Sequence, residues 1–114
     1  MKARVVVIDP WSEKIYNAEI DLANDSGASA IRSLIGYHFA LATRLKNGDV
    51  IYIDRRGDPE EVGFLVRDYE FLEQLTFCPG IGVICGSDIH GNTLDARSTI
   101  SEIEKIIQFV SVDD

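Results

Sequence analysis

The chain has 114 residues, of which 46% are hydrophobic and 26% are charged. This length and composition predict one compact domain, residues 1–114, and exclude a disordered or repetitive chain. Asp and Glu number 19 against 11 Lys and Arg, which gives a net charge of −8. Because an acidic surface repels phosphate groups, direct binding to nucleic acid or to an anionic membrane is disfavoured.

The N-terminal segment and the cysteines indicate a cytoplasmic protein without a cofactor. The apolar run Val5–Ile8 is too short for the core of a signal peptide, and no stretch is apolar over the length of a membrane span. Cys78 and Cys85 are separated by six residues, a spacing that fits neither a redox Cys-x-x-Cys motif nor a zinc-binding pair. We therefore expect both thiols to be reduced and packed.

Two strands that form a hairpin are predicted at the N-terminus. Arg4–Asp9 is dense in β-branched residues, and Lys14–Ile20 alternates between two sets of side chains. One face of the second strand carries Tyr16, Ala18 and Ile20, and we expect this face to point toward the core. The turn-forming residues between the two strands predict antiparallel pairing.

One helix of about three turns is predicted within Asp21–Gly36. Apolar residues recur there at helical spacing, so one side of the helix can pack on a sheet. Asp25 or Ser26 can accept hydrogen bonds from the free amides of the first turn, and Gly36 stands where a left-handed residue ends a helix.

A second hairpin is predicted around the Asn47-Gly48 pair. Phe39, Leu41, Thr43 and Leu45 alternate with Ala40, Ala42 and Arg44, and Val50–Asp54 is the matching strand. Asn and Gly both tolerate positive φ, which is the conformation that tight hairpin turns require. The sequence therefore predicts two adjacent antiparallel strands here.

The second half of the chain predicts a short strand, a buried central strand and a closing helix. Phe64–Val66 is expected to be a strand, and a short helix or an irregular turn is expected over the rest of 60–77. The β-branched residues between the glycines of Gly82–Gly86 predict the buried central strand. Apolar residues at helical spacing predict a helix over Ile100–Val110, with a capping box at Thr99 or two residues later.

Together these elements predict an α+β fold. We expect a mainly antiparallel sheet of about five to six strands, with the two main helices packed on one face of it. The expected order along the chain is β-β-α-β-β-β-β-α.

The polar turn after the central strand, Ser87–Asn92, resembles the first metal-binding motif of calcineurin-like metallophosphoesterases. In that motif an Asp and a His two positions later bind one of two metal ions at the end of a strand. The resemblance implies that Asp88 and His90 are metal ligands, and such a pair can hold a divalent ion that activates water. The chain lacks the family's later Gly-Asp-x-x-Asp and Asn-His segments, so a polar turn built around Asp88 is the alternative.

Three glycines in the same region raise the possibility of a nucleotide site. Gly80 and Gly82 fit the start of a dinucleotide-binding fingerprint, but Gly86 stands one position too late for its third glycine. These glycines also precede or lie within a strand and do not open a helix, so their amides would not converge on a pyrophosphate. The glycines nevertheless leave a domain that binds a small ligand or a nucleotide as a second alternative.

Four features resemble small uncharacterised proteins of phages, plasmids and other mobile elements, which are grouped as a domain of unknown function. The features are the opening Val7–Pro10 segment, the helix ended by Gly36, the hairpin, and the Gly80–Gly86 strand followed by an acidic helix. The resemblance implies a role in a mobile element and assigns no activity and no site residue.

The function expected first is that of a non-enzymatic, acidic binding protein that acts through protein–protein contacts. It would have an unidentified protein partner and the capacity to form a homodimer, and no catalytic residue is assigned. The alternatives are metal-dependent phosphoesterase activity at Asp88 and His90, and binding of a small ligand or a nucleotide.

Overall fold

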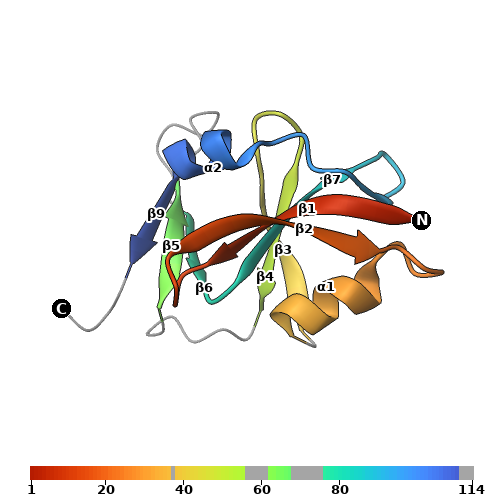
Figure 1. Ribbon diagram of the computed structural model, residues 1–114, viewed down its shortest axis with the longest axis horizontal. Helices are drawn as coiled ribbons and strands as arrows, with labels where there is room; N and C mark the ends of the chain where they lie inside the picture. The colour runs from red at the N-terminus through yellow and green to blue at the C-terminus, as the bar shows by residue number, and fades with distance from the viewer. Residues whose placement is uncertain (37, 56–61, 68–75, 111–114) are drawn as a thin grey trace.

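The computed structural model describes residues 1–36, 38–55, 62–67 and 76–110, which form two antiparallel sheets and two helices (Figure 1). The main sheet contains β1 (Lys2–Asp9), β2 (Lys14–Asp21), β3 (Phe39–Arg44), β4 (Val50–Asp54), β7 (Gly82–Ser87) and β8 (Thr93–Leu94). Its strand order is β2-β1-β7-β4-β3, and β8 pairs with the end of β7. The small sheet contains β5 (Gly63–Val66), β6 (Thr76–Pro79) and β9 (Ile107–Val110), in the order β6-β5-β9.

The structure confirms the predicted α+β class, with an antiparallel main sheet and two helices, α1 (Ala28–Ile35) and α2 (Ile100–Ile106). The small sheet is an addition to the predicted order, because it pairs β5 and β6 with β9, which lies far from both in the chain. Neither described helix is long and apolar enough to cross a membrane.

The predicted N-terminal hairpin is confirmed. β1 and β2 pair over their whole lengths, from Lys2 opposite Asp21 to Asp9 opposite Lys14. On the predicted core-facing side of β2, Ile20 is buried, but Tyr16 is 42% exposed. The expected burial therefore holds at one end of β2 and not at the other.

The two helices lie on opposite faces of the main sheet, so the prediction that both pack on one face is wrong. Val5 of β1 packs in the same cluster as Ile31 of α1. Its neighbour Val6 packs in a second cluster, with Ile103 of α2 and with Phe64 of the small sheet. Successive side chains of a strand point to opposite faces, and β1 is apolar on both of them, so each face requires a covering layer.

The predicted buried central strand is confirmed as β7. It lies between β1 and β4, with Ile84 opposite both Val6 and Ile51. Its residues Val83, Ile84 and Cys85 have no exposed surface. A strand that is paired on both sides and covered on both faces is the centre of the fold.

Helix α1 is shorter than predicted, with eight residues in place of about three turns. The residue before the helix is Gly27, with φ 86°, and Ser26 also has a positive φ. Asp25 accepts hydrogen bonds at Oδ2 from the amide and the hydroxyl of Ser29, so it caps the first turn from outside the helix. Gly36 ends the helix as predicted, but with φ 140° and ψ 171° it does not have the predicted left-handed helical conformation. Because the backbone is left-handed at Ser26 and Gly27, the helix begins only at Ala28.

The hairpin formed by β3 and β4 is confirmed, but its turn is not the predicted one. Gly48 has a positive φ of 94°, and its amide donates to the carbonyl of Leu45 at 3.0 Å. Among the described non-glycine residues, positive φ occurs at Glu13, Ala23 and Ser26, and not at Asn47. Instead, the Asn47 side chain accepts the amide of Asp49 at 2.9 Å, so that side chain stabilises the turn.

The closing helix ends earlier than predicted. Thr99 is its N-cap, and reciprocal hydrogen bonds between Thr99 and Glu102 form the predicted capping box. The helix stops at Ile106, and Ile107–Val110 continues as β9, which pairs with β5. The predicted helical range Ile100–Val110 is therefore wrong in its last four residues. Pairing with β5, which is distant in sequence, makes these four residues a strand and not the end of the helix.

The segment before the central strand contains two strands of the small sheet. β5 confirms the predicted strand at Phe64–Val66. β6 ends at Pro79, a residue without an amide hydrogen, which the strand tolerates because β6 lies at the edge of the small sheet as described. The short helix or irregular turn expected before β6 falls on residues 68–75, outside the described residues.

Candidate functional site

The sequence-predicted metal ligand Asp88 forms the centre of its own turn. Its Oδ1 accepts the amides of His90 at 2.8 Å and Asn92 at 2.9 Å, and its Oδ2 accepts the side-chain amide of Asn92 at 3.0 Å. Hydrogen bonds from Asn92, and more weakly from His90, lower the pKa of the Asp88 carboxyl below its ordinary value. The carboxylate therefore organises the loop from residue 88 to residue 92.

Among the residues that the structure describes, no further ligand set lies beside Asp88 and His90. His90 is exposed, and the turn is closed by the amide of Gly91 donating to the carbonyl of Asp88 at 3.1 Å. Within the described ranges, no three His, Cys, Asp or Glu side chains are grouped so that they could hold a metal ion. A metal site at Asp88 and His90 stays a prediction.

The three glycines of the suggested nucleotide loop are explained by close packing. A Cβ atom on Gly82 would lie 2.5 Å from the ring of Phe64, and one on Gly86 would lie 2.5 Å from the carbonyl oxygen of Asp95. Gly80 has a φ of 74° and lies beside the Trp11 ring. These positions need glycine for packing and backbone conformation, and nucleotide binding stays a prediction.

Both cysteines are free and buried. Burial raises the pKa of Cys78 to about 12. Burial, followed by the negative charge of Asp49, raises the pKa of Cys85 to about 12. Because the thiolate is the nucleophile, neither thiol is reactive at neutral pH.

A buried aspartate close to Cys85 connects two distant parts of the chain. Asp49, at the start of β4, has no exposed surface. Its carboxylate accepts the amide of Arg97 at both oxygens, at 3.0 and 2.9 Å. Its Oδ2 also accepts the amide of Ser98 at 2.8 Å and the Ser98 hydroxyl at 2.7 Å. These charge-assisted bonds fix the hairpin turn to the segment before α2.

Two further bonds complete this connection. The side-chain amide of Asn47 donates to the hydroxyl oxygen of Ser98 at 2.8 Å, and the guanidinium of Arg97 donates to the carbonyl of Asn47 at 3.1 Å. The Ser98 hydroxyl therefore donates to Asp49 and accepts from Asn47. We call these four residues, Asn47, Asp49, Arg97 and Ser98, the Asp49 junction.

The segment before α2 is also fixed to β1 through Arg4. The Arg4 guanidinium donates to the carbonyls of Ala96 and Ser98, and the backbone of Arg4 bonds to Asp95 and Ala96. With the Asp49 junction on one side and Arg4 on the other, residues 95–98 are held to two strands of the main sheet. The start of α2 is positioned by these bonds.

A surface groove of about 400 Å³ lies between the turn of the β3–β4 hairpin and α2. Its apolar floor is formed by Leu45, Ile103 and Ile106. Lys46 and Lys105 lie at its rim, on the turn and on the helix. The remaining wall is polar and consists of Asn47, Ser98 and Glu102. Because Asn47 and Ser98 belong to the Asp49 junction, the bonds of the junction shape one side of the groove.

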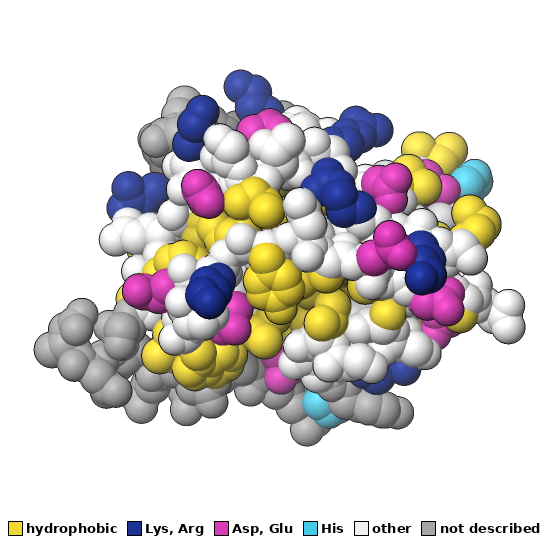
Figure 2. Space-filling model, viewed as in Figure 1, with side chains coloured by type: hydrophobic (Ala, Val, Ile, Leu, Met, Phe, Trp, Pro, Cys, Tyr) yellow, Lys and Arg dark blue, Asp and Glu magenta, His cyan; other side chains and the backbone are white. Residues whose placement is uncertain are grey.

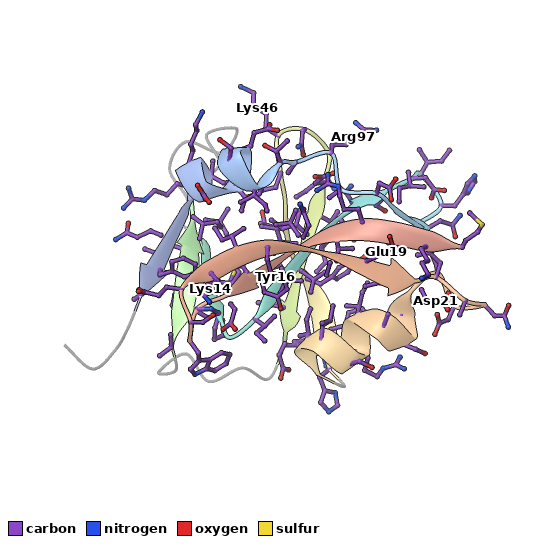
Figure 3. All side chains as sticks on the ribbon, viewed as in Figure 1. Lys14, Tyr16, Glu19, Asp21, Lys46 and Arg97 are labelled. Atoms are coloured by element: carbon purple, nitrogen blue, oxygen red, sulfur yellow. The ribbon has the colours of Figure 1, made fainter. Side chains whose placement is uncertain are left out.

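The groove lies in the part of the surface where positive charge gathers. Figure 2 shows Lys and Arg side chains along the edge that carries α2 and the hairpin turn. Lys46 and Arg97 both lie along that edge in Figure 3. Glu102, the acidic residue of the wall, is engaged in the capping box with Thr99. On a chain with a net charge of −8, this is a local cationic surface over an apolar floor.

No local sequence pattern identifies this site. Asp49 follows an Asn-Gly pair and appears as one more turn residue, while its partners Arg97 and Ser98 lie 48 and 49 positions later. A local signal does exist, because Asp49 directly precedes the apolar Val50 and Ile51, and this position predicts that Asp49 is buried. That signal predicts the burial of Asp49 and does not identify Arg97 and Ser98 as its partners.

Comparison of the chain with protein-family models, with curated proteins and with solved structures finds no match. The site is therefore interpreted from its own geometry.

Proposed function

We propose that this protein is a non-enzymatic binding protein whose groove between the hairpin turn and α2 receives a segment of a protein partner. The observation that supports the proposal is the combination of an apolar floor with two lysines at the rim. The partner segment carries apolar side chains for the floor and acidic side chains for the rim. As part of the proposal, the protein acts in the cytoplasm as an accessory protein of a phage or another mobile element, a role suggested by its sequence resemblance.

The floor can supply affinity. Ile103 is buried in the core, and Ile106 is half-buried, so the floor is continuous with the interior of the protein. Burying one Leu-sized side chain of a partner on such a surface stabilises a complex by roughly 1.5–3 kcal/mol. Two such side chains reach the range of a transient protein complex once the entropy cost of association is subtracted.

The rim can supply specificity. Lys46 and Lys105 attract carboxylates, while the negative charge of the whole chain repels acidic molecules from its other surfaces. An acidic partner is therefore directed to the groove. Because the two lysines are solvated, their contribution falls as salt concentration rises.

Selection of peptides from a random display library by the wild-type chain tests the proposal. The Lys46→Glu/Lys105→Glu variant serves for counter-selection, and Lys14→Glu, a charge reversal on β2, is the matched control. We expect the enriched peptides to combine acidic and apolar residues, to bind the control as they bind the wild type, and to lose affinity for the double variant. A lack of enrichment, or peptides that bind the double variant equally well, would refute the proposed site.

A further inference from the structure

β2 is an edge strand of the main sheet, and within the described part of the chain its one strand partner is β1. Most of its side chains are exposed. Lys14, Tyr16, Glu19 and Asp21 follow one another along β2 on the face shown in Figure 3. Figure 2 shows hydrophobic side chains in the centre of the same face, over β2, and Tyr16 is 42% exposed. An exposed edge with apolar surface is a template for pairing with another strand.

The hydrogen bonds around β1 show which residues of β2 have outward backbone groups. The amide of Leu22 donates to the carbonyl of Met1 at 2.9 Å, so even-numbered residues from Lys14 to Leu22 face β1 in the alternating antiparallel pattern. Arg4, which is opposite Glu19, uses its amide and carbonyl on Asp95 and Ala96, on its other side. Both observations leave the backbone groups of Ile15, Asn17, Glu19 and Asp21 directed to the open edge.

We propose that this edge pairs with β2 of a second copy of the chain, antiparallel and around a two-fold axis at Ala18. In this arrangement Ile15 lies opposite Asp21 of the second copy, and Asn17 lies opposite Glu19 of the second copy. All residues that exchange hydrogen bonds then belong to the outward set, as antiparallel pairing requires. The pairing continues the main sheet across the two copies and goes beyond the proposed groove, because it uses a different surface.

The side chains are complementary in this register. Asn17 accepts a hydrogen bond from the Arg4 guanidinium at its Oδ1, at 2.8 Å, so its NH₂ group is the part that donates to Glu19 of the second copy. On the other face, the exposed Tyr16 lies opposite Ile20 of the second copy, whose side chain is already buried, and diagonally next to its half-buried Ala18. Each contact occurs twice because the interface is two-fold symmetric.

Charge excludes the neighbouring registers. A shift by one residue would set outward backbone groups opposite groups already bonded to β1, so shifts occur in steps of two. One such shift places Glu19 opposite Glu19 of the second copy. The shift in the other direction places Asp21 opposite Glu13 of the second copy. Like charges directly opposite each other are destabilising, so the register centred on Ala18 is favoured.

Sedimentation equilibrium of the full chain, combined with one edge variant, tests the pairing. Asn17→Pro removes an amide that the β1–β2 hairpin does not use and places a ring on the open edge. We expect a concentration-dependent wild-type dimer and a folded, monomeric Asn17→Pro chain, with Asn17→Ala, which keeps the amide, as the matched control. A wild type that is monomeric up to about 1 mM, or a folded Asn17→Pro chain that still forms the dimer, would overturn the proposal.

A charge exchange tests the register and does not depend on the proline variant. Asn17→Glu places like charges opposite each other twice, so we expect about tenfold weaker dimerisation. Adding Glu19→Lys sets Lys opposite Glu in both pairs, and we expect the dimer to return. In either neighbouring register the second substitution would not restore complementary pairs. Unchanged dimerisation of Asn17→Glu, or no rescue by Glu19→Lys, would contradict the proposed register.

Discussion

The turn at Asp88 and the turn at Asp49 use the same hydrogen-bonding chemistry. They differ in how far along the chain the partners of the carboxylate lie. Each centres on an aspartate whose carboxylate accepts backbone amides. The Asp88 carboxylate bonds within its own exposed loop, up to Asn92, whereas the buried Asp49 carboxylate bonds to residues 48 and 49 positions away. The comparison shows that a hydrogen-bonded aspartate can either complete a loop or connect distant elements. In this protein the second kind shapes the candidate binding site.

The largest effect is expected from Asp49→Ala. The substitution leaves the buried amides of Arg97 and Ser98 and the Ser98 hydroxyl without their acceptor, and we expect a loss of about 3 kcal/mol or more in the free energy of unfolding. Urea denaturation monitored by circular dichroism measures this loss. Asp88→Ala is the matched control. Equal losses in the two variants would show that the long-range bonds of Asp49 stabilise the protein no more than the local bonds of Asp88.

The reactivity of Cys85 provides a second, independent measure of the Asp49 junction. The native thiol is protected by burial and by the charge of Asp49, which raise its pKa to about 12. If Asp49→Ala lowers the free energy of opening by the amount expected above, labelling by a disulfide reagent accelerates about a hundredfold. Asp88→Ala is expected to leave the labelling rate near that of the wild type. Equal labelling rates in all three chains would contradict this part of the account.

A smaller effect is expected from Thr99→Ala, next to the junction. The substitution removes the hydroxyl that accepts the amide of Glu102 and so breaks the capping box of α2. Loss of such an N-cap costs about 1 kcal/mol. Thermal denaturation measures it, and Thr99→Ser, which keeps the hydroxyl, is expected to behave as the wild type. A loss as large as that of Asp49→Ala would show that the cap and not the junction holds α2.

Asp88→Asn is expected to have a still smaller effect, and one that depends on pH. The Asp88 carboxyl has a pKa below its ordinary 3.8, so its contribution is present above pH 3.8 and is lost as pH falls through the lowered value. The stability difference between wild type and Asp88→Asn should therefore shrink as the solution is acidified. Denaturation at a series of pH values measures it, and a difference that grows on acidification would contradict the sign of the shift.

The smallest difference is expected on adding metal. If Asp88 acts as the acceptor of its own turn, Mn²⁺ or Zn²⁺ changes the melting temperature of the wild type and of Asp88→Ala/His90→Ala equally. Thermal denaturation with and without each metal provides the measurement. Stabilisation of the wild type alone would revive the metal site that the sequence motif predicts.

The sequence predicted those elements whose signal is local. β4 matches its predicted range, Val50–Asp54, and the Gly82–Gly86 strand is central and buried, because composition and flanking turn residues determine both. Ile107–Val110 has helical spacing, yet it forms a strand because β5 is available as a partner. Pairing with a distant strand does not appear in any local pattern.

For the candidate site, too, local features were predicted from the sequence and long-range features were not. Asp88 and His90 were predicted because they stand in one short motif, and the structure places Asp88 in a local turn. The groove was not predicted because its floor combines Leu45 with residues of α2 from the other end of the chain. Long-range contacts of this kind require the fold before the site can be recognised.

We expect partner binding to depend on the groove beside the Asp49 junction and not on the Asp88 turn. Fluorescence anisotropy with one library-selected peptide tests it most directly, by comparing the wild type, Lys46→Glu/Lys105→Glu and Asp88→Ala/His90→Ala. We expect at least about tenfold weaker binding to the lysine variant and unchanged binding to the Asp88/His90 variant. Unchanged binding to the lysine variant, with loss of binding to the Asp88/His90 variant, would contradict it.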